Sequence, residues 1–109
     1  MYHEIMAEQK KLDISVKALR KTGTDYAQAE RDYKVALRQE ALKLRDADMA
    51  IGMIDKTVYG IPAVADARFK RDVAEAVYKA NLESINAIKL TIKVMMNQYD
   101  KEYSTAQAD

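Results

Sequence analysis

The sequence predicts an all-α fold, a long antiparallel helical hairpin with a short connector helix, in a single domain that spans residues 1–109. The chain has only three glycines and one proline, too few for a turn-rich β fold, and helix-forming residues dominate it. Apolar residues also recur at heptad spacing in two long stretches that flank one short interruption. Because short connections favour antiparallel neighbours, these stretches predict two helices that pack side by side.

A first long helix is expected over about residues 2–47. Five of its apolar residues fall seven positions apart, and three more lie on a neighbouring row: Ile5, Leu12, Leu19, Tyr26 and Tyr33, then Val16, Leu37 and Leu44. Glu30 and Lys34 are spaced as an acid-to-base pair on an exposed helix face. Gly23 is the weak point, because glycine inside a helix costs about 1 kcal/mol relative to alanine. The heptad phase is the same on both sides of Gly23, so we expect one continuous helix.

The connector, about residues 48–61, is the least repetitive part of the sequence. Asp48 is placed to cap a short helix, Gly60 to end it, and Pro62 to begin the next long helix. Six apolar residues of the connector form a candidate surface for a partner: Met49, Ile51, Met53, Ile54, Val58 and Tyr59. The same residues could instead plug the end of a helical bundle.

The second long helix is expected over about residues 62–103, with a frayed tail at 104–109. Its main apolar stripe runs from Val64 to Tyr99, and a second set widens the apolar surface: Phe69, Val73, Val77 and Leu82. One neighbouring helix cannot cover that surface, so we expect a homodimer that forms a four-helix bundle or a coiled coil. The candidate residues for self-association are Leu82, Ile85, Ile88, Ile92, Met95 and Met96.

The sequence offers little material for catalysis. His3 is the only histidine, there is no cysteine, and the three glycines are scattered rather than gathered in a phosphate-binding loop. We therefore expect no enzymatic activity, no metal site and no cofactor. The first residues do not follow the order of a secretion signal, and no stretch is apolar enough to span a membrane, so we expect a cytoplasmic protein.

Two further kinds of partner stay open. Bases beside tyrosines can hold nucleic acid, and the candidate residues for such a face are Arg31, Lys34, Arg38, Arg68, Lys70 and Arg71. Eighteen basic and seventeen acidic residues give a net charge of +1, which argues against nucleic acid, because phosphate binding depends on a strong basic field. A pocket between subunits could also take up a small nucleotide without any sequence motif.

Three runs of the sequence resemble small uncharacterised helical proteins of tailed phages and prophages of Gram-positive bacteria. They are Asp25-Tyr-Ala-Gln-Ala-Glu-Arg-Asp-Tyr-Lys-Val-Ala-Leu-Arg, Ala67-Arg-Phe-Lys-Arg-Asp-Val-Ala-Glu-Ala-Val-Tyr-Lys and Glu83-Ser-Ile-Asn-Ala-Ile-Lys-Leu. The resemblance implies a protein made inside an infected or lysogenic bacterium, encoded near recombination and replication genes, and it transfers no site residues. Our leading hypothesis is a non-enzymatic accessory protein that acts as a helical homo-oligomer by binding a host or viral protein.

Overall fold

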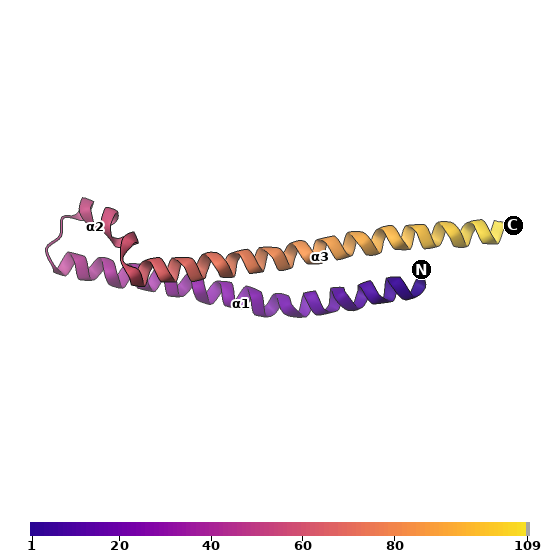
Figure 1. The fold of residues 1–109 in the computed structure, drawn as a ribbon, viewed down its shortest axis with the longest axis horizontal. Coiled ribbons are helices and arrows are strands. Elements are labelled where there is room, and N and C mark those ends of the chain that lie inside the picture. The colour runs from indigo at the N-terminus through magenta and orange to yellow at the C-terminus, as the bar shows by residue number, and fades with distance from the viewer. Residues whose placement is uncertain (109) are drawn as a thin grey trace. The chain divides into compact units, whose positions relative to one another are not determined.

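The described part of the chain is all-α: it consists of helices joined by short turns and contains no strand. The structure is a computed structural model, which describes the backbone of residues 1–108 and the side chains of residues 1–104. Helix α1 spans Tyr2–Asp46, α2 spans Ile51–Thr57, the short 3-10 helix η1 spans Val58–Gly60, and α3 spans Pro62–Ala108 (Figure 1). The order of a long helix, a short helix and a second long helix agrees with the prediction.

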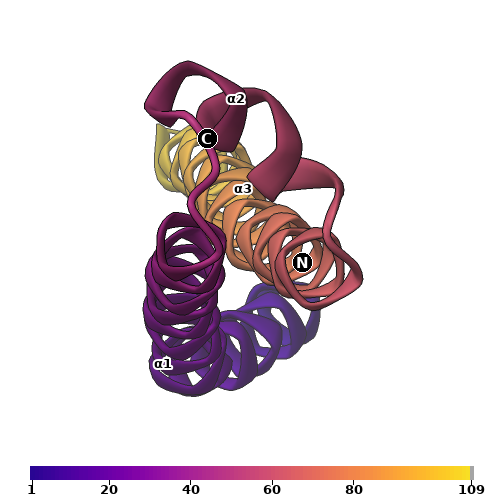
Figure 2. The same ribbon diagram turned by 90° about the vertical axis from the view of Figure 1, so that its left-hand side faces the viewer.

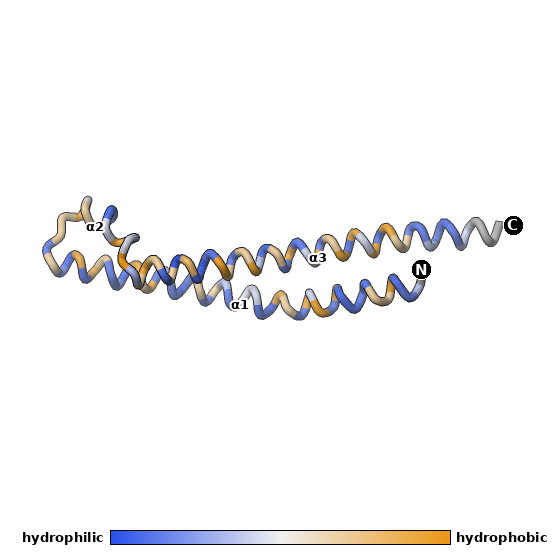
Figure 3. The backbone as a smooth tube through the Cα atoms, in the orientation of Figure 1, coloured by the Kyte–Doolittle hydropathy of each residue, from blue (hydrophilic) through white to orange (hydrophobic). Residues whose placement is uncertain are grey.

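Helix α1 is continuous through Gly23, as the unchanged heptad phase predicted. The five residues spaced by seven are buried or half-buried: Ile5, Leu12, Leu19, Tyr26 and Tyr33. Val16 departs from the expected neighbouring row, because its side chain is exposed. Hydrophobic and hydrophilic residues alternate along both long helices (Figure 3). One apolar stripe therefore organises α1, as the periodicity indicated.

The end of α1 is a Schellman motif built on Asp48. The backbone N–H of Met49 donates to the carbonyl of Leu44 at 3.1 Å, and the N–H of Asp48 donates to the carbonyl of Arg45 at 3.0 Å. Asp48 has a φ of 64°, the left-handed conformation that this motif requires. The prediction that Asp48 caps the following helix is wrong, because the residue terminates α1 instead. The N-cap of α2 is Ala50, which makes no side-chain capping hydrogen bond.

The chain contains two compact units, and each long helix contributes to both. The terminal unit comprises Met1–Lys21 and Lys79–Asp109, and the connector unit comprises Thr22–Tyr78.

The connector unit has a small apolar core formed by Tyr33, Val58 and Val64. Half-buried side chains surround it: Leu37, Ala41, Leu44, Ile61 and Ala67. Figures 1 and 2 show the segment of α2 and η1 at the junction between α1 and α3. Pro62 begins α3, as predicted, and the carbonyl of Ile61 accepts the first N–H groups of that helix, from Val64 and Ala65, at 2.9 Å each.

The terminal unit buries Ile5 of α1 and Ile85 and Ile92 of α3. The side-chain amide of Asn81 donates a hydrogen bond to the backbone carbonyl of Ser15 at 3.0 Å. This part-buried hydrogen bond adds a directional polar contact to a unit whose buried residues are apolar.

Helix α3 continues beyond the expected end near Tyr103, as far as Ala108. The last residues include alanine and glutamine, which are good helix formers, and no glycine or proline interrupts them. Of the tail expected at 104–109, the backbone up to residue 108 is helical, and Asp109 lies outside the described residues.

Candidate interaction surfaces

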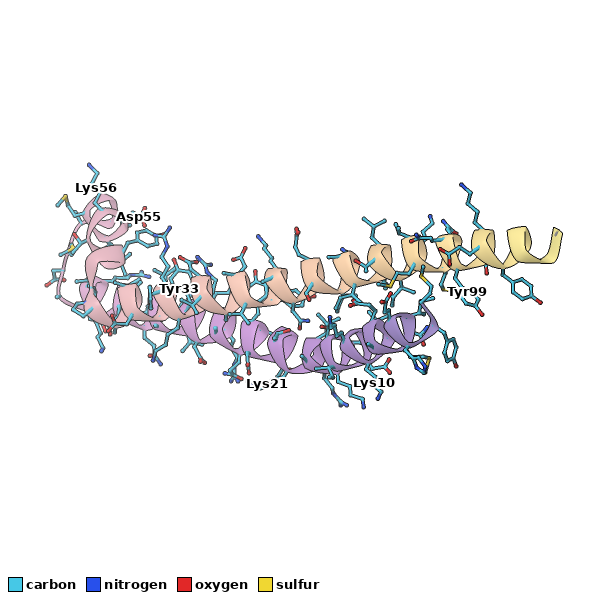
Figure 4. The ribbon with its side chains drawn as sticks, turned by 45° about the vertical axis from the view of Figure 1, so that its right-hand side comes forward. Lys10, Lys21, Tyr33, Asp55, Lys56 and Tyr99 are labelled. Atoms are coloured by element: carbon cyan, nitrogen blue, oxygen red, sulfur yellow. The ribbon has the colours of Figure 1, made fainter. Side chains whose placement is uncertain are left out.

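The connector divides its predicted partner surface between an inner and an outer face. Val58 is 3% exposed and belongs to the core of the connector unit, and Ile54 is also buried. By contrast, Ile51 is 79% exposed, and Met53 and Tyr59 are exposed too. Asp55 and Lys56 project from the same short helix in Figure 4. The two alternatives that the sequence left open therefore concern different residues: the buried Ile54 and Val58 are placed for the core, and the exposed Ile51, Met53 and Tyr59 are accessible to a partner.

All six residues predicted for self-association belong to the terminal unit, and most of their side chains are buried or half-buried there. Ile85 and Ile92 are buried there, and Leu82, Ile88 and Met95 are half-buried, whereas Met96 is exposed. The chain itself uses these side chains for its own packing. The sequence indicated these residues as an interface because they form the most apolar stripe of α3. The same apolar character favours burial of that stripe within the folded chain.

Two groups of exposed apolar residues lie on α3, and the sequence had indicated the first of them as part of the set that widens the apolar surface. In the connector unit they are Phe69, Val73 and Val77, which line a shallow groove with Thr22, Asp25, Lys70 and Ala74. In the terminal unit they include Leu90 and Val94, together with Met96, Tyr99 and Tyr103. A second heptad phase along α3 was the signal that could have identified Leu90 and Val94.

Three of the six predicted nucleic-acid contacts share one face of α1. Arg31, Lys34 and Arg38 line an open groove along that helix, together with Ala27, Glu30, Val35 and Gln39. Within it, the ammonium group of Lys34 lies 3.6 Å from a carboxylate oxygen of Glu30, the pair that the spacing predicted. The side chain of Lys34 is largely exposed, so this ion pair leaves its charge accessible to solvent.

Arg71 is engaged within the connector unit. Its guanidinium group lies 3.3 Å from a carboxylate oxygen of Glu30 and 2.8 Å from one of Asp72, and it stands 4.6 Å from the ring centroid of Tyr33. The hydrogen bond to Asp72 raises the pKa of Arg71 above its ordinary value, burial opposes this shift, and the hydrogen bond to Glu30 adds to it. Arg71 therefore links α3 to α1 within this unit, and the carboxylates of Glu30 and Asp72 partly compensate its charge.

Lys70 lies outside the groove that Arg31, Lys34 and Arg38 line. It lines a groove with three acidic residues, Asp25, Asp32 and Asp66. Arg68 is exposed on α3 and lines none of the grooves described here. The six predicted bases therefore do not form one continuous basic face.

Among the described residues, no three His, Cys, Asp or Glu side chains are grouped so that they could hold a metal ion. None of the described helices combines the length and the apolar character that crossing a membrane requires. No protein-family model matches the sequence, and neither a curated protein nor a solved structure matches it. The surfaces described above are thus the basis for a functional proposal.

Proposed function

We propose that the protein is a non-enzymatic helical scaffold that acts by protein–protein interaction as a homodimer, in which α1 and α3 form an antiparallel hairpin along their length. Consistent with the resemblance of its sequence runs, we place it in a bacterium that carries a phage or prophage. The observation that supports the proposal is the exposed apolar surface of α3. Leu90 and Val94 in the terminal unit offer a surface to a second copy, and Phe69, Val73 and Val77 in the connector unit offer one to another protein.

The free energy gained by removing this apolar surface from water favours association with a partner. Apolar area removed from water contributes about 25 cal/mol per Å², so several exposed large side chains on one helix represent a substantial favourable free energy for association. Phe69 is 69% exposed, and Val73 and Val77 follow it at intervals of four residues on the same helix. Single exposed apolar residues are ordinary, but a row of them on one helix face is typical of an interaction site.

The decisive experiment is the solution mass of the purified chain by light scattering over a hundredfold range of concentration, with small-angle scattering on the same samples. The proposal predicts a dimer whose fraction rises with concentration. A chain that stays monomeric at the highest concentration would contradict self-association. A compact monomeric particle in the scattering curve would contradict the hairpin as well.

The outer face of the connector is the candidate surface for a second, different partner. Ile51 and Met53 are exposed there, while Ile54 on the inner face is buried. Ile51→Asp and Met53→Asp should leave the thermal midpoint and the dimer unchanged, because neither side chain contributes to the core. If either variant unfolds the connector unit, the outer face is structural and this part of the proposal fails.

A nucleic-acid-binding accessory role is the second candidate, and the groove that holds Arg31, Lys34 and Arg38 favours it. A fluorescence titration with single-stranded DNA at low salt tests it, because phosphate contacts are strongest under that condition. Binding at micromolar affinity or tighter that is lost in Arg31→Glu and Arg38→Glu would support this role. The same affinity in both variants, or no binding at low salt, would remove it.

A further inference from the structure

Helix α3 carries a second heptad row within the terminal unit, different from the row that it buries. We call this row the outer seam, and its residues alternate at intervals of three and four: Glu83, Ala87, Leu90, Val94, Asn97 and Lys101. All six are exposed, whereas Ile85 and Ile92 on the packed side of the same helix are buried. The spacing is that of a coiled-coil seam, so its geometry fits a neighbouring helix.

The middle of the outer seam is apolar. Leu90 is 62% exposed and Val94 is 57% exposed. The hydroxyl of the adjacent Thr91 donates a hydrogen bond to the carbonyl of Ala87 at 3.0 Å, so this polar group is satisfied by its own helix. A partner helix could therefore cover this region without leaving an unsatisfied hydroxyl.

The charges of the outer seam lie at its two ends and have opposite signs. Glu83 and Lys101 are equally far along the sequence from the midpoint between Leu90 and Val94, and Ala87 and Asn97 are also equally far from it. A twofold axis through that midpoint would bring each residue against its counterpart in a second helix of the same sequence running in the opposite direction. The outer seam is therefore complementary to itself in an antiparallel pair of identical helices.

We propose that the outer seam pairs with the outer seam of a second copy of this chain in an antiparallel arrangement. In this pairing Leu90 packs against the partner's Val94, and Val94 packs against the partner's Leu90. Glu83 meets the partner's Lys101, and the symmetry repeats that ion pair at the other end. A parallel arrangement in the same register would instead place like charges opposite each other, which is destabilising.

This inference rests on the proposed self-association and specifies its surface. It also explains why Ile85 and Ile92 can be buried within the chain while the chain still dimerises, because the two functions use opposite faces of α3. An isologous interface of this kind closes on itself, so it produces a dimer and no longer assembly.

Charge reversal tests the pairing by sedimentation equilibrium. Glu83→Lys alone and Lys101→Glu alone should each weaken the dimer by about tenfold, because each change replaces two attractive pairs by two repulsive ones. The double variant Glu83→Lys/Lys101→Glu should return to within about threefold of the natural chain, since it restores opposite charges across the axis. Failure of the double variant to recover would overturn the antiparallel register.

Disulfide trapping tests the direction of the helices, and it needs no removal of natural cysteines because the chain has none. A mixture of Glu83→Cys and Lys101→Cys proteins should form a mixed disulfide dimer under mild oxidation. Glu83→Cys alone should form none at low concentration, because its two thiols would lie at opposite ends of the interface. Rapid self-linkage of Glu83→Cys would show a parallel dimer and overturn the proposal.

A matched pair of variants separates this inference from the wider proposal. Leu90→Glu should dissociate the dimer, while Phe69→Glu, at a comparably exposed site of the same helix, should leave it intact, with helical content unchanged in both. A dimer that survives Leu90→Glu, or that is lost in Phe69→Glu, overturns the outer seam but not self-association. A natural chain that is monomeric at every concentration overturns both.

Discussion

The guanidinium group of Arg71 stands 4.6 Å from the ring centroid of Tyr33, so a cation on α3 covers the face of a buried aromatic ring on α1. The same guanidinium bonds to Glu30, one helical turn before Tyr33. Figure 4 labels Tyr33 within the connector unit. One guanidinium group therefore contacts both a core residue, Tyr33, and the carboxylate of Glu30.

Replacement of Tyr33 by alanine should destabilise the chain by about 3 kcal/mol, because it removes the largest side chain of the connector core. Tyr33→Phe should cost much less, since it keeps the ring that Arg71 covers. Arg71→Ala should lower the thermal midpoint in the natural chain but have less effect in the Tyr33→Ala background. Urea unfolding of the four proteins as a double-mutant cycle measures this coupling, and strictly additive effects would contradict it.

Replacement of Asp48 by glycine should stabilise the chain by about 0.5 kcal/mol. The residue has a φ of 64°, where glycine avoids the steric cost that a side chain meets, and its carboxylate is unfavourable beside the negative end of α1. Asp48→Val should be destabilising, because β-branched residues tolerate this conformation poorly. The midpoints of urea unfolding check both changes, and a loss of stability in Asp48→Gly would be the contrary result.

Replacement of Gly23 by alanine should stabilise α1 by roughly 0.8 kcal/mol, the usual difference between these residues inside a helix. An added Cβ would lie 3.6 Å from Cε2 of Tyr78, which is ordinary van der Waals contact. Gly23→Leu should be destabilising, since a large side chain would collide with the tyrosine ring. A lower melting temperature for Gly23→Ala, measured by circular dichroism, would mean that Tyr78 needs the space beside the glycine.

The two faces of the connector should respond differently to alanine. Val58→Ala should cost about 2 kcal/mol, because Val58 is 3% exposed in the core, whereas Ile51→Ala should change stability by less than about 0.5 kcal/mol. Chemical unfolding monitored by circular dichroism distinguishes the two. Equal losses at both positions would indicate that the outer face of α2 is also covered by the folded chain.

The sequence predicted much of the local structure because helix propensity and heptad periodicity act over short distances. The start of α3 at Pro62, the continuity of α1 through Gly23 and the buried row from Ile5 to Tyr33 all follow from such local rules. The role of Asp48 could not be read in the same way. Aspartate favours both helix N-caps and left-handed turns, and only the position at which α1 ends decides between them.

The candidate surfaces depended on information that no single helix contains. The apolar residues of α3 form two overlapping heptad phases, and periodicity along one helix does not distinguish the phase that faces α1. Packing decided it: Ile85 and Ile92 are buried, and Leu90 and Val94 remain on the outside. Packing also places the predicted basic residues on different surfaces. Arg71 forms an ion pair with Glu30, whereas Lys70 lines the groove that contains three aspartates.

The sequence by itself thus determined the helices, their approximate limits and the row of α1 that is buried, since these depend on propensity and periodicity along one chain. Only the tertiary structure decided which row of α3 is buried, which connector residues enter the core and which charges are paired. Those outcomes depend on the rotation of each helix about its axis, and that rotation is fixed by the side chains of its neighbour rather than by its own sequence.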